Sequence, residues 1–158
     1  FYRYYEDKYE LLSDIEDDLI TFLIDERKET LEHIEVENLF EVKNIINLMK
    51  TLEQYSEVLE VLLTNSSIMS FQMKIRKVIS NRLDFFNQIN KGSKIRLDLG
   101  KEYLISIIIK TLEYWLLHKE EIDEEEIASL IRDVYNHGIL KAININPKDL
   151  QKFKTFQS

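Results

Sequence analysis

The chain has 158 residues and a formal net charge of −8 at pH 7, with 29 acidic against 21 basic residues. The length suffices for one well-buried domain, and 44% hydrophobic with 32% charged residues is a composition typical of globular proteins. The acidic balance argues against nucleic-acid binding by this segment, since neutralising phosphates requires clustered Lys and Arg. Because Cys is absent, disulfides, thiolate zinc sites and cysteine nucleophiles are excluded.

Residues that interrupt helices are scarce, with three Gly and one Pro in the whole sequence. This scarcity predicts long helices and an all-α, multi-helix bundle. No apolar run approaches the roughly 20 residues that are needed to span a bilayer, and no signal-peptide pattern is visible. We therefore expect a cytoplasmic protein without membrane contact.

The first predicted helix leaves an aromatic cluster at the start of the chain. Asp7 is placed to cap it, and Glu10 three residues later completes a capping box. Apolar residues at helical spacing predict a helix from about Lys8 to near Arg27. The acidic residues off this stripe are expected on a solvated face, with a cation or partner site as the alternative. They are Asp14, Glu16, Asp17 and Asp18.

A second apolar stripe runs from Leu39 to Leu62, with Asn38 as a candidate cap, and ends at the polar run 64–67, which also offers a new N-cap. The next helix is apolar on one side up to Phe86. Its other side is basic, and we expect this basic cluster either on a solvated face or as an anion-attracting pocket rim or partner contact. The cluster comprises Lys74, Arg76, Lys77 and Arg82.

Residues 90–94 form the next break, residues 95–99 are expected as a turn or short helix, and Gly100 is a candidate further break. The most apolar helix is predicted from about Lys101 to His118. It is apolar on two faces, which predicts burial against the core on one side and against a second subunit on the other.

The last predicted helix starts at a capping-box pair, Asp123 and Glu126. Gly138 has two interpretations, a C-cap or a point where a partner helix approaches closely. After Pro147 the sequence becomes polar and is expected to be a frayed tail.

The opening residues also resemble a family motif. Tyr2, Tyr5, Lys8 and the pair Leu11-Leu12 match Y-x-x-[FY]-x-x-K-x-x-L-L, with Tyr in place of the more usual Phe at position 5. This motif closes the DNA-binding domain of TetR-type bacterial transcriptional regulators, and the order of predicted helices resembles that family's C-terminal domain.

The resemblance implies three parts: a remnant of the recognition helix (1–6), an effector-binding and dimerisation domain (7–147) and a polar tail (148–158). It implies a homodimer whose last two long helices form a four-helix interface. DNA operator binding is implied only through an N-terminal domain mostly outside this chain, with phosphate contacts from Tyr2 and Lys8.

Catalytic, metal and cofactor motifs were not found. The three His residues lack metal-ligand spacing, and three Gly cannot supply a phosphate loop. We therefore expect no enzyme, no metal and no cofactor. The function class that remains is binding. The ligand is either a small apolar or amphipathic effector among the middle helices or, in the alternative, a partner protein without any small ligand.

Two sets of residues are candidates for these contacts. Aromatic and Met residues, although typical of cores, are the effector-pocket candidates: Met49, Tyr55, Phe71, Phe86 and Trp115. The terminal helices supply the dimer-interface candidates: Tyr103, Ile107, Tyr114, Ile127, Ile131, Val134 and Gly138.

Overall fold

The computed structural model describes residues 8–31, 38–65, 69–89 and 92–152, and the secondary-structure elements in these ranges are all helical. The prediction of an all-α bundle is thus confirmed. The elements are α1 (Lys8–Leu31), α2 (Val42–Glu53), α3 (Ser56–Thr64), α4 (Ser70–Arg82), α5 (Phe85–Ile89), α6 (Lys94–Leu117), α7 (Glu124–Val134), the π-helical η2 (Tyr135–Ile139), α8 (Leu140–Ala142) and the 3-10 helix η3 (Pro147–Lys152).

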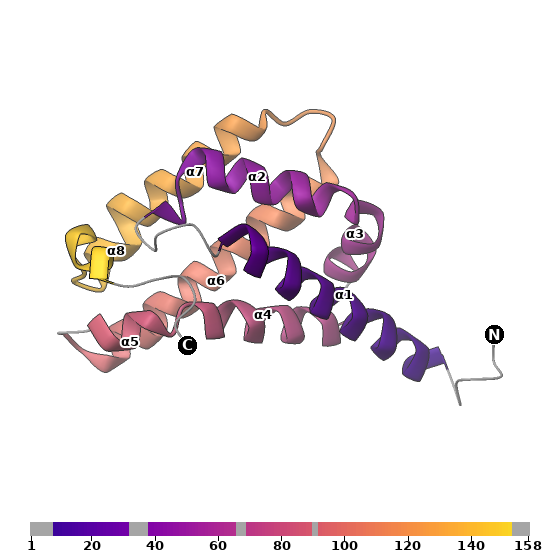
Figure 1. Cartoon of the computed structure of the whole chain (residues 1–158), viewed down its shortest axis with the longest axis horizontal. Coiled ribbons are helices and arrows are strands. Elements are labelled where there is room, and N and C mark those ends of the chain that lie inside the picture. The colour runs from indigo at the N-terminus through magenta and orange to yellow at the C-terminus, as the bar shows by residue number, and fades with distance from the viewer. Residues whose placement is uncertain (1–7, 32–37, 66–68, 90–91, 153–158) are drawn as a thin grey trace.

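Helix α6 is the central element of the bundle. Helices α3, α4 and α7 pack on it, α2 lies beside α7, and α1 crosses α4 (Figure 1). The N-terminal end of α1 projects beyond the other helices (Figure 1). Most of the described helices contribute to one apolar core, in which Phe71, Phe86 and Trp115 are among the largest buried side chains.

The region from Leu39 to Leu62, predicted as one continuous apolar stripe, contains two helices. Helix α2 ends at Glu53 and α3 begins at Ser56, with Tyr55 between them. The Tyr55 ring packs against Phe22 of α1 at a centroid distance of 4.3 Å. Asn38 does not cap α2, whose N-cap position is Glu41; instead its carbonyl accepts a hydrogen bond from the Asn44 side chain at 2.7 Å.

Helix α6 begins earlier than predicted, because residues 95–99 form its first turns. Ser93 is its N-cap, and the hydroxyl oxygen accepts from the Arg96 amide at 3.4 Å. Gly100 is not a break but lies buried inside the helix. A Cβ at this position would collide with Cγ2 of Ile143. Glycine is needed here because α6 and the chain at Ile143 approach closely.

The capping role of Asp123 is confirmed, since its carboxylate accepts from the Glu125 amide at 3.0 Å. Helical structure then continues through η2 to Ala142, so Gly138 is not a C-cap. The cap lies at Asn144, which has a φ of 60°. The Asn144 amide donates to the Lys141 carbonyl and the Ile145 amide to that of Leu140, the Schellman pattern.

The first helix and the C-terminal tail both differ from the prediction. Helix α1 continues to Leu31, four residues beyond Arg27. The predicted polar tail begins with η3, in which Leu150 is 1% exposed and belongs to the core. Several predictions fall outside the described residues, namely the cap at Asp7, the N-cap at 66–67 and the phosphate contact of Tyr2.

Candidate functional site

A cavity of about 110 Å³ lies among the helices of the bundle. Its wall is contributed by α1, α2, α3, α4, α6 and α7, and it is apolar except for Arg82 and Thr111. The described residues that line it are Ile20, Leu23, Ile24, Ile45, Leu48, Met49, Leu52, Leu59, Ile75, Val78, Ile79, Arg82, Ile108, Thr111, Leu112, Trp115, Ile127 and Ile131. Such an apolar pocket with few polar groups is the usual form of a small-molecule site.

The two polar side chains of the wall differ in what they can offer a ligand. The Thr111 hydroxyl donates to the Ile107 carbonyl of its own helix at 2.7 Å, so it faces a ligand as an acceptor only. Arg82, the last residue of α4, is half-buried, and burial lowers the pKa of its guanidinium from the ordinary value. Arginine nevertheless remains charged, so Arg82 brings one positive charge to the cavity.

Two of the five pocket residues predicted from sequence lie in the cavity wall, namely Met49 and Trp115. Phe71 and Phe86 are completely buried core residues and Tyr55 packs on Phe22, so none of these three lines the cavity. Whether an effector contacts Met49 or Trp115 stays a prediction.

The sequence does not predict the contribution of α1 to this wall. The periodicity of α1 predicts an apolar stripe, but it does not show which part of the stripe faces core atoms and which part faces a cavity.

The basic cluster of α4 is a solvated face only in part: Lys77 is exposed, but the other three residues have contacts within the bundle. Lys74 pairs with Asp17 and Glu16 of α1 at 2.8 and 3.0 Å. Arg76 contacts α6, with Glu102 at 3.4 Å and the Ser106 hydroxyl at 3.0 Å. Arg82 lines the cavity, as the pocket-rim alternative predicts. The contacts of Lys74 and Arg76 with α1 and α6 lie within the chain and match neither interpretation.

Glu16 is also not solvated, because its side chain is 0% exposed beneath α4. Its Oε1 accepts a hydrogen bond from the Ser70 hydroxyl at 2.6 Å. Lys74 Nζ lies 3.0 Å from Oε2, close enough for an ion pair but outside hydrogen-bond angles. We name Glu16, Asp17, Ser70 and Lys74 the α1–α4 clasp.

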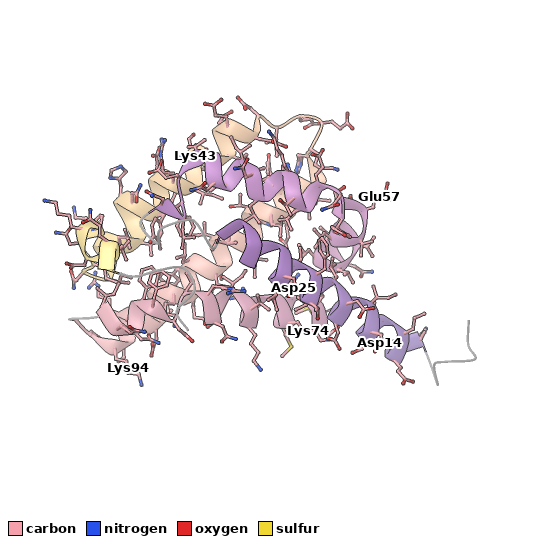
Figure 2. The ribbon with its side chains drawn as sticks, viewed as in Figure 1. Asp14, Asp25, Lys43, Glu57, Lys74 and Lys94 are labelled. Carbon is pink, nitrogen blue, oxygen red and sulfur yellow. The ribbon has the colours of Figure 1, made fainter. Side chains whose placement is uncertain are left out.

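The clasp lies where α4 crosses α1, and Figure 2 shows Lys74 at this crossing. The hydrogen bond that Lys74 donates to the Asp17 carboxylate is the main cause that raises the pKa of Lys74, while burial acts in the opposite direction. The clasp thus fixes the position of α4 relative to α1 through charged and hydrogen-bonded groups.

The predicted interface residues separate into three groups. Tyr103 and Tyr114 are 55% and 49% exposed on α6, and Gly138 is surrounded by open space. Ile127 and Ile131 instead line the cavity, on the inner side of α7. Ile107 and Val134 are half-buried.

The exposed apolar residues of α6 lie along one side of the helix. Leu99, Tyr103, Tyr114 and Leu117 are each about half exposed, and they fall on one face at 100° per residue. We name these four residues the α6 stripe. The exposed Lys110 lies on the same face and divides the stripe into two apolar pairs, Leu99 with Tyr103 and Tyr114 with Leu117. Exposed apolar patches of this kind mark candidate interaction surfaces.

Two other kinds of feature, a metal site and a membrane-spanning helix, are absent from the described residues. No group of three or more His, Asp or Glu residues in the described ranges is arranged to hold a metal ion. None of the described helices has the length and hydropathy to cross a membrane.

His118, at the end of α6, contacts Tyr114 of the same helix. Its ring stacks on the Tyr114 ring at a centroid distance of 4.1 Å, and its Nδ1 lies 2.9 Å from the Tyr114 carbonyl oxygen.

An all-α bundle around an apolar cavity, with a charged clasp on its first helix, has the architecture of a helical regulatory domain. Comparison with known families agrees. Residues 42–137, which run from the start of α2 into η2, match the TetR-type family described as "Transcriptional regulator C-terminal region". No curated protein and no solved structure matches the chain.

The family match spans more than half of the chain and does not include the opening motif, so the two indications are independent. The chain belongs to the TetR-type transcriptional regulators and contains their C-terminal region. Its role lies in the regulation of transcription.

Proposed function

We propose that this chain is the effector-binding and dimerisation domain of a cytoplasmic bacterial repressor that releases DNA when a small molecule enters the cavity. One observation carries the proposal: α1, which the family resemblance makes the connector to the DNA-binding domain, forms part of the cavity wall. Its contribution is Ile20, Leu23 and Ile24. An occupant of the cavity therefore contacts the helix whose position governs DNA binding.

The clasp supplies a second route from the cavity to α1. Helix α4 contributes Val78 and Arg82 to the wall and is held to α1 by Lys74. An effector that binds one arrangement of α4 and α1 better than the other shifts the population toward that arrangement. The size of the shift is limited by the difference between its two affinities.

The effect of this shift on DNA binding requires two subunits. Dimeric DNA readers bind half-sites about one helical turn, roughly 34 Å, apart. A displacement of α1 in each subunit changes the separation of the two recognition helices and lowers operator affinity. The family's N-terminal domain makes these DNA contacts, with Tyr2 and Lys8 positioning the protein on phosphates.

The α6 stripe is the surface that we propose for the dimer. Its four apolar residues are about half exposed although they lie on the central helix of the bundle. Burial of apolar surface favours association, and a second copy of α6 offers a matching face. Gly138 allows close approach to η2, because no described atom lies within 4 Å of a Cβ built there.

The alternative, a module that responds only to a partner protein, predicts a filled interior. A cavity of about 110 Å³ with a single guanidinium supports the effector instead.

The test uses the full-length protein and a fluorescent DNA fragment selected from genomic DNA by its binding. Light scattering over a dilution series should give a dimer, and an added effector should lower DNA affinity. Val78→Phe, in the cavity wall, should abolish the effector response without lowering DNA affinity. Met73→Phe, on the same helix but 70% exposed, is the matched control and should respond like the wild type.

A folded monomer without sequence-specific DNA binding would overturn the proposal. A dimer that binds DNA and responds equally with and without Val78→Phe would place the trigger outside this cavity.

A further inference from the structure

We propose that the effector is a small neutral apolar molecule, no larger than benzene, that binds among the aliphatic side chains and Trp115 of the cavity. The inference rests on the proposed function, since it names the chemical class of the molecule that this cavity binds. The members of this class are compact hydrocarbons and similar molecules of about five or six non-hydrogen atoms.

The two polar residues of the wall are already engaged within the protein. The Thr111 hydroxyl donates its hydrogen to the Ile107 carbonyl of α6, at 2.7 Å. Arg82 already has an interaction partner in the protein, so its burial does not require an anionic ligand. The cavity therefore has no unmet need for a charged or strongly polar ligand.

A charged ligand would lose its hydration in the cavity without gaining a counter-charge of its own. None of the described lining residues is acidic, so an ammonium group finds no carboxylate in this wall. A carboxylate would have to displace or share the existing partner of Arg82. Burying an ion without a dedicated partner is far more costly than burying an apolar group. The wall thus disfavours cations and anions alike.

The rest of the wall offers contacts that suit an apolar molecule. Apart from Thr111 and Arg82, the described lining side chains are aliphatic, with Met49 and Trp115 among them. Leu59 and Trp115 are among the most deeply buried side chains of the core. Water is held poorly between such side chains, because it needs several polar partners, so an apolar ligand gains hydrophobic burial at little cost.

The volume of the cavity limits the size of the ligand. The cavity measures about 110 Å³, and a sealed apolar cavity of about 150 Å³ accommodates benzene. Benzene is therefore the upper limit, and a five-membered ring is a closer match. Met49 has a flexible, unbranched side chain, so it can adjust this part of the wall to the shape of the molecule.

The experiment compares three probes that have five non-hydrogen atoms each and differ in charge: cyclopentane, propionate and butylammonium. Binding to the full-length protein is measured at equal ionic strength, by NMR titration and by the shift of the thermal unfolding midpoint. We expect cyclopentane to bind at least about ten times more tightly than either ion, because each ion is desolvated without a partner. Naphthalene, which is neutral but larger than benzene, should not bind.

Two variants of α4 locate the binding site. Val78→Phe fills part of the cavity and should lower the affinity for cyclopentane at least about tenfold. Met73→Phe adds a ring at an exposed position of the same helix and should leave this affinity within about twofold of the wild type. The ranking of the probes in the wild type decides the proposal whether or not Val78→Phe folds.

Propionate or butylammonium that binds the wild type as tightly as cyclopentane would overturn the neutral-ligand proposal and leave the proposed function standing, with a charged effector. Tight binding of naphthalene would overturn the size limit, and equal binding of cyclopentane to the wild type and to Val78→Phe would overturn the site. Failure of all probes to bind would also overturn the proposal, and the effect of Val78→Phe on DNA release would then decide the proposed function separately.

Discussion

Tyr135 is the first residue of η2 and one of the most buried side chains, with 1% of its surface exposed. Its ring stacks on Phe40 at a centroid distance of 3.9 Å. Its hydroxyl has no hydrogen-bond partner within the part of the chain that the structure describes. Burial raises the pKa of Tyr135 well above its ordinary value, because the phenolate would be desolvated.

We expect Tyr135→Phe to raise the free energy of unfolding at neutral pH by up to about 1 kcal/mol, because the ring contact is kept and an unsatisfied buried hydroxyl is removed. The pH dependence has a definite sign. An unfolded tyrosine ionises near pH 10, whereas folded Tyr135 stays protonated, so its contribution is complete below pH 10 and is lost as the pH rises.

Urea unfolding between pH 7 and pH 11 measures both effects. The wild type should lose stability above pH 10 more steeply than Tyr135→Phe. Tyr55→Phe, at a half-buried position outside the α6 stripe, is the control and should follow the wild type. Equal alkaline losses in all three proteins would contradict the prediction.

A second prediction at this scale concerns Gly100, where the chain tolerates no side chain. Gly100→Ala should cost about 1–3 kcal/mol, the usual cost of overpacking, although alanine in a helix interior is normally favourable. Cγ2 of the stiff, buried Ile143 side chain is the atom that would collide. In an Ile143→Ala background the same substitution should become neutral or stabilising. Equal costs in both backgrounds, measured by urea unfolding, would exclude the collision as the cause.

At the scale of elements, the α1–α4 clasp has the largest consequences. It places a fully buried carboxylate between two helices that both line the cavity. Buried ion pairs are weak contributors to net stability, but removing one partner leaves an uncompensated charge. The clasp thus favours one relative position of α1 and α4.

We expect Glu16→Gln to lower the free energy of unfolding by about 1–3 kcal/mol, because Lys74 loses one of its two carboxylates and the buried amide is poorly satisfied. In the full-length protein it should also weaken the dependence of DNA affinity on effector. Asp14→Asn, exposed on the same helix (Figure 2), should change neither quantity. Loss of stability with an unchanged effector response would make the clasp purely structural.

At the scale of the whole molecule, the prediction concerns the dimer. Tyr103→Glu and Tyr114→Glu should each convert the dimer to a folded monomer, because a charge within the α6 stripe would be buried at the interface without a partner. The measurement is light scattering over a dilution series, with circular dichroism as the check of folding.

Val61→Glu is the matched control, since Val61 is 56% exposed, as Tyr103 is, but lies on α3. It should leave the dimer intact. Ile131→Glu should act differently from the stripe variants and abolish effector binding, because Ile131 lines the cavity. Dimers that persist in both Tyr variants would place the interface elsewhere.

The sequence by itself determined the helical class, the capping of α7 by Asp123 and the family. The helical class follows from the scarcity of Gly and Pro in the whole sequence. The cap and the family motif depend on residues within a few positions of one another, namely a carboxylate beside the first free amides and a short N-terminal motif. It also left two interpretations of the basic cluster of α4 open, namely a solvated face, or a pocket rim or partner contact.

The tertiary structure decided everything that depends on which helix faces meet. Glu16 is buried because Ser70 and Lys74, more than fifty positions away, lie above it. Gly100 lies within α6 and marks a close approach rather than a break, because the side chain of Ile143 leaves no room for a Cβ there. The cavity arises where six helices fail to fill the space between them, and the volume left between packed faces is not encoded in the periodicity of any one helix.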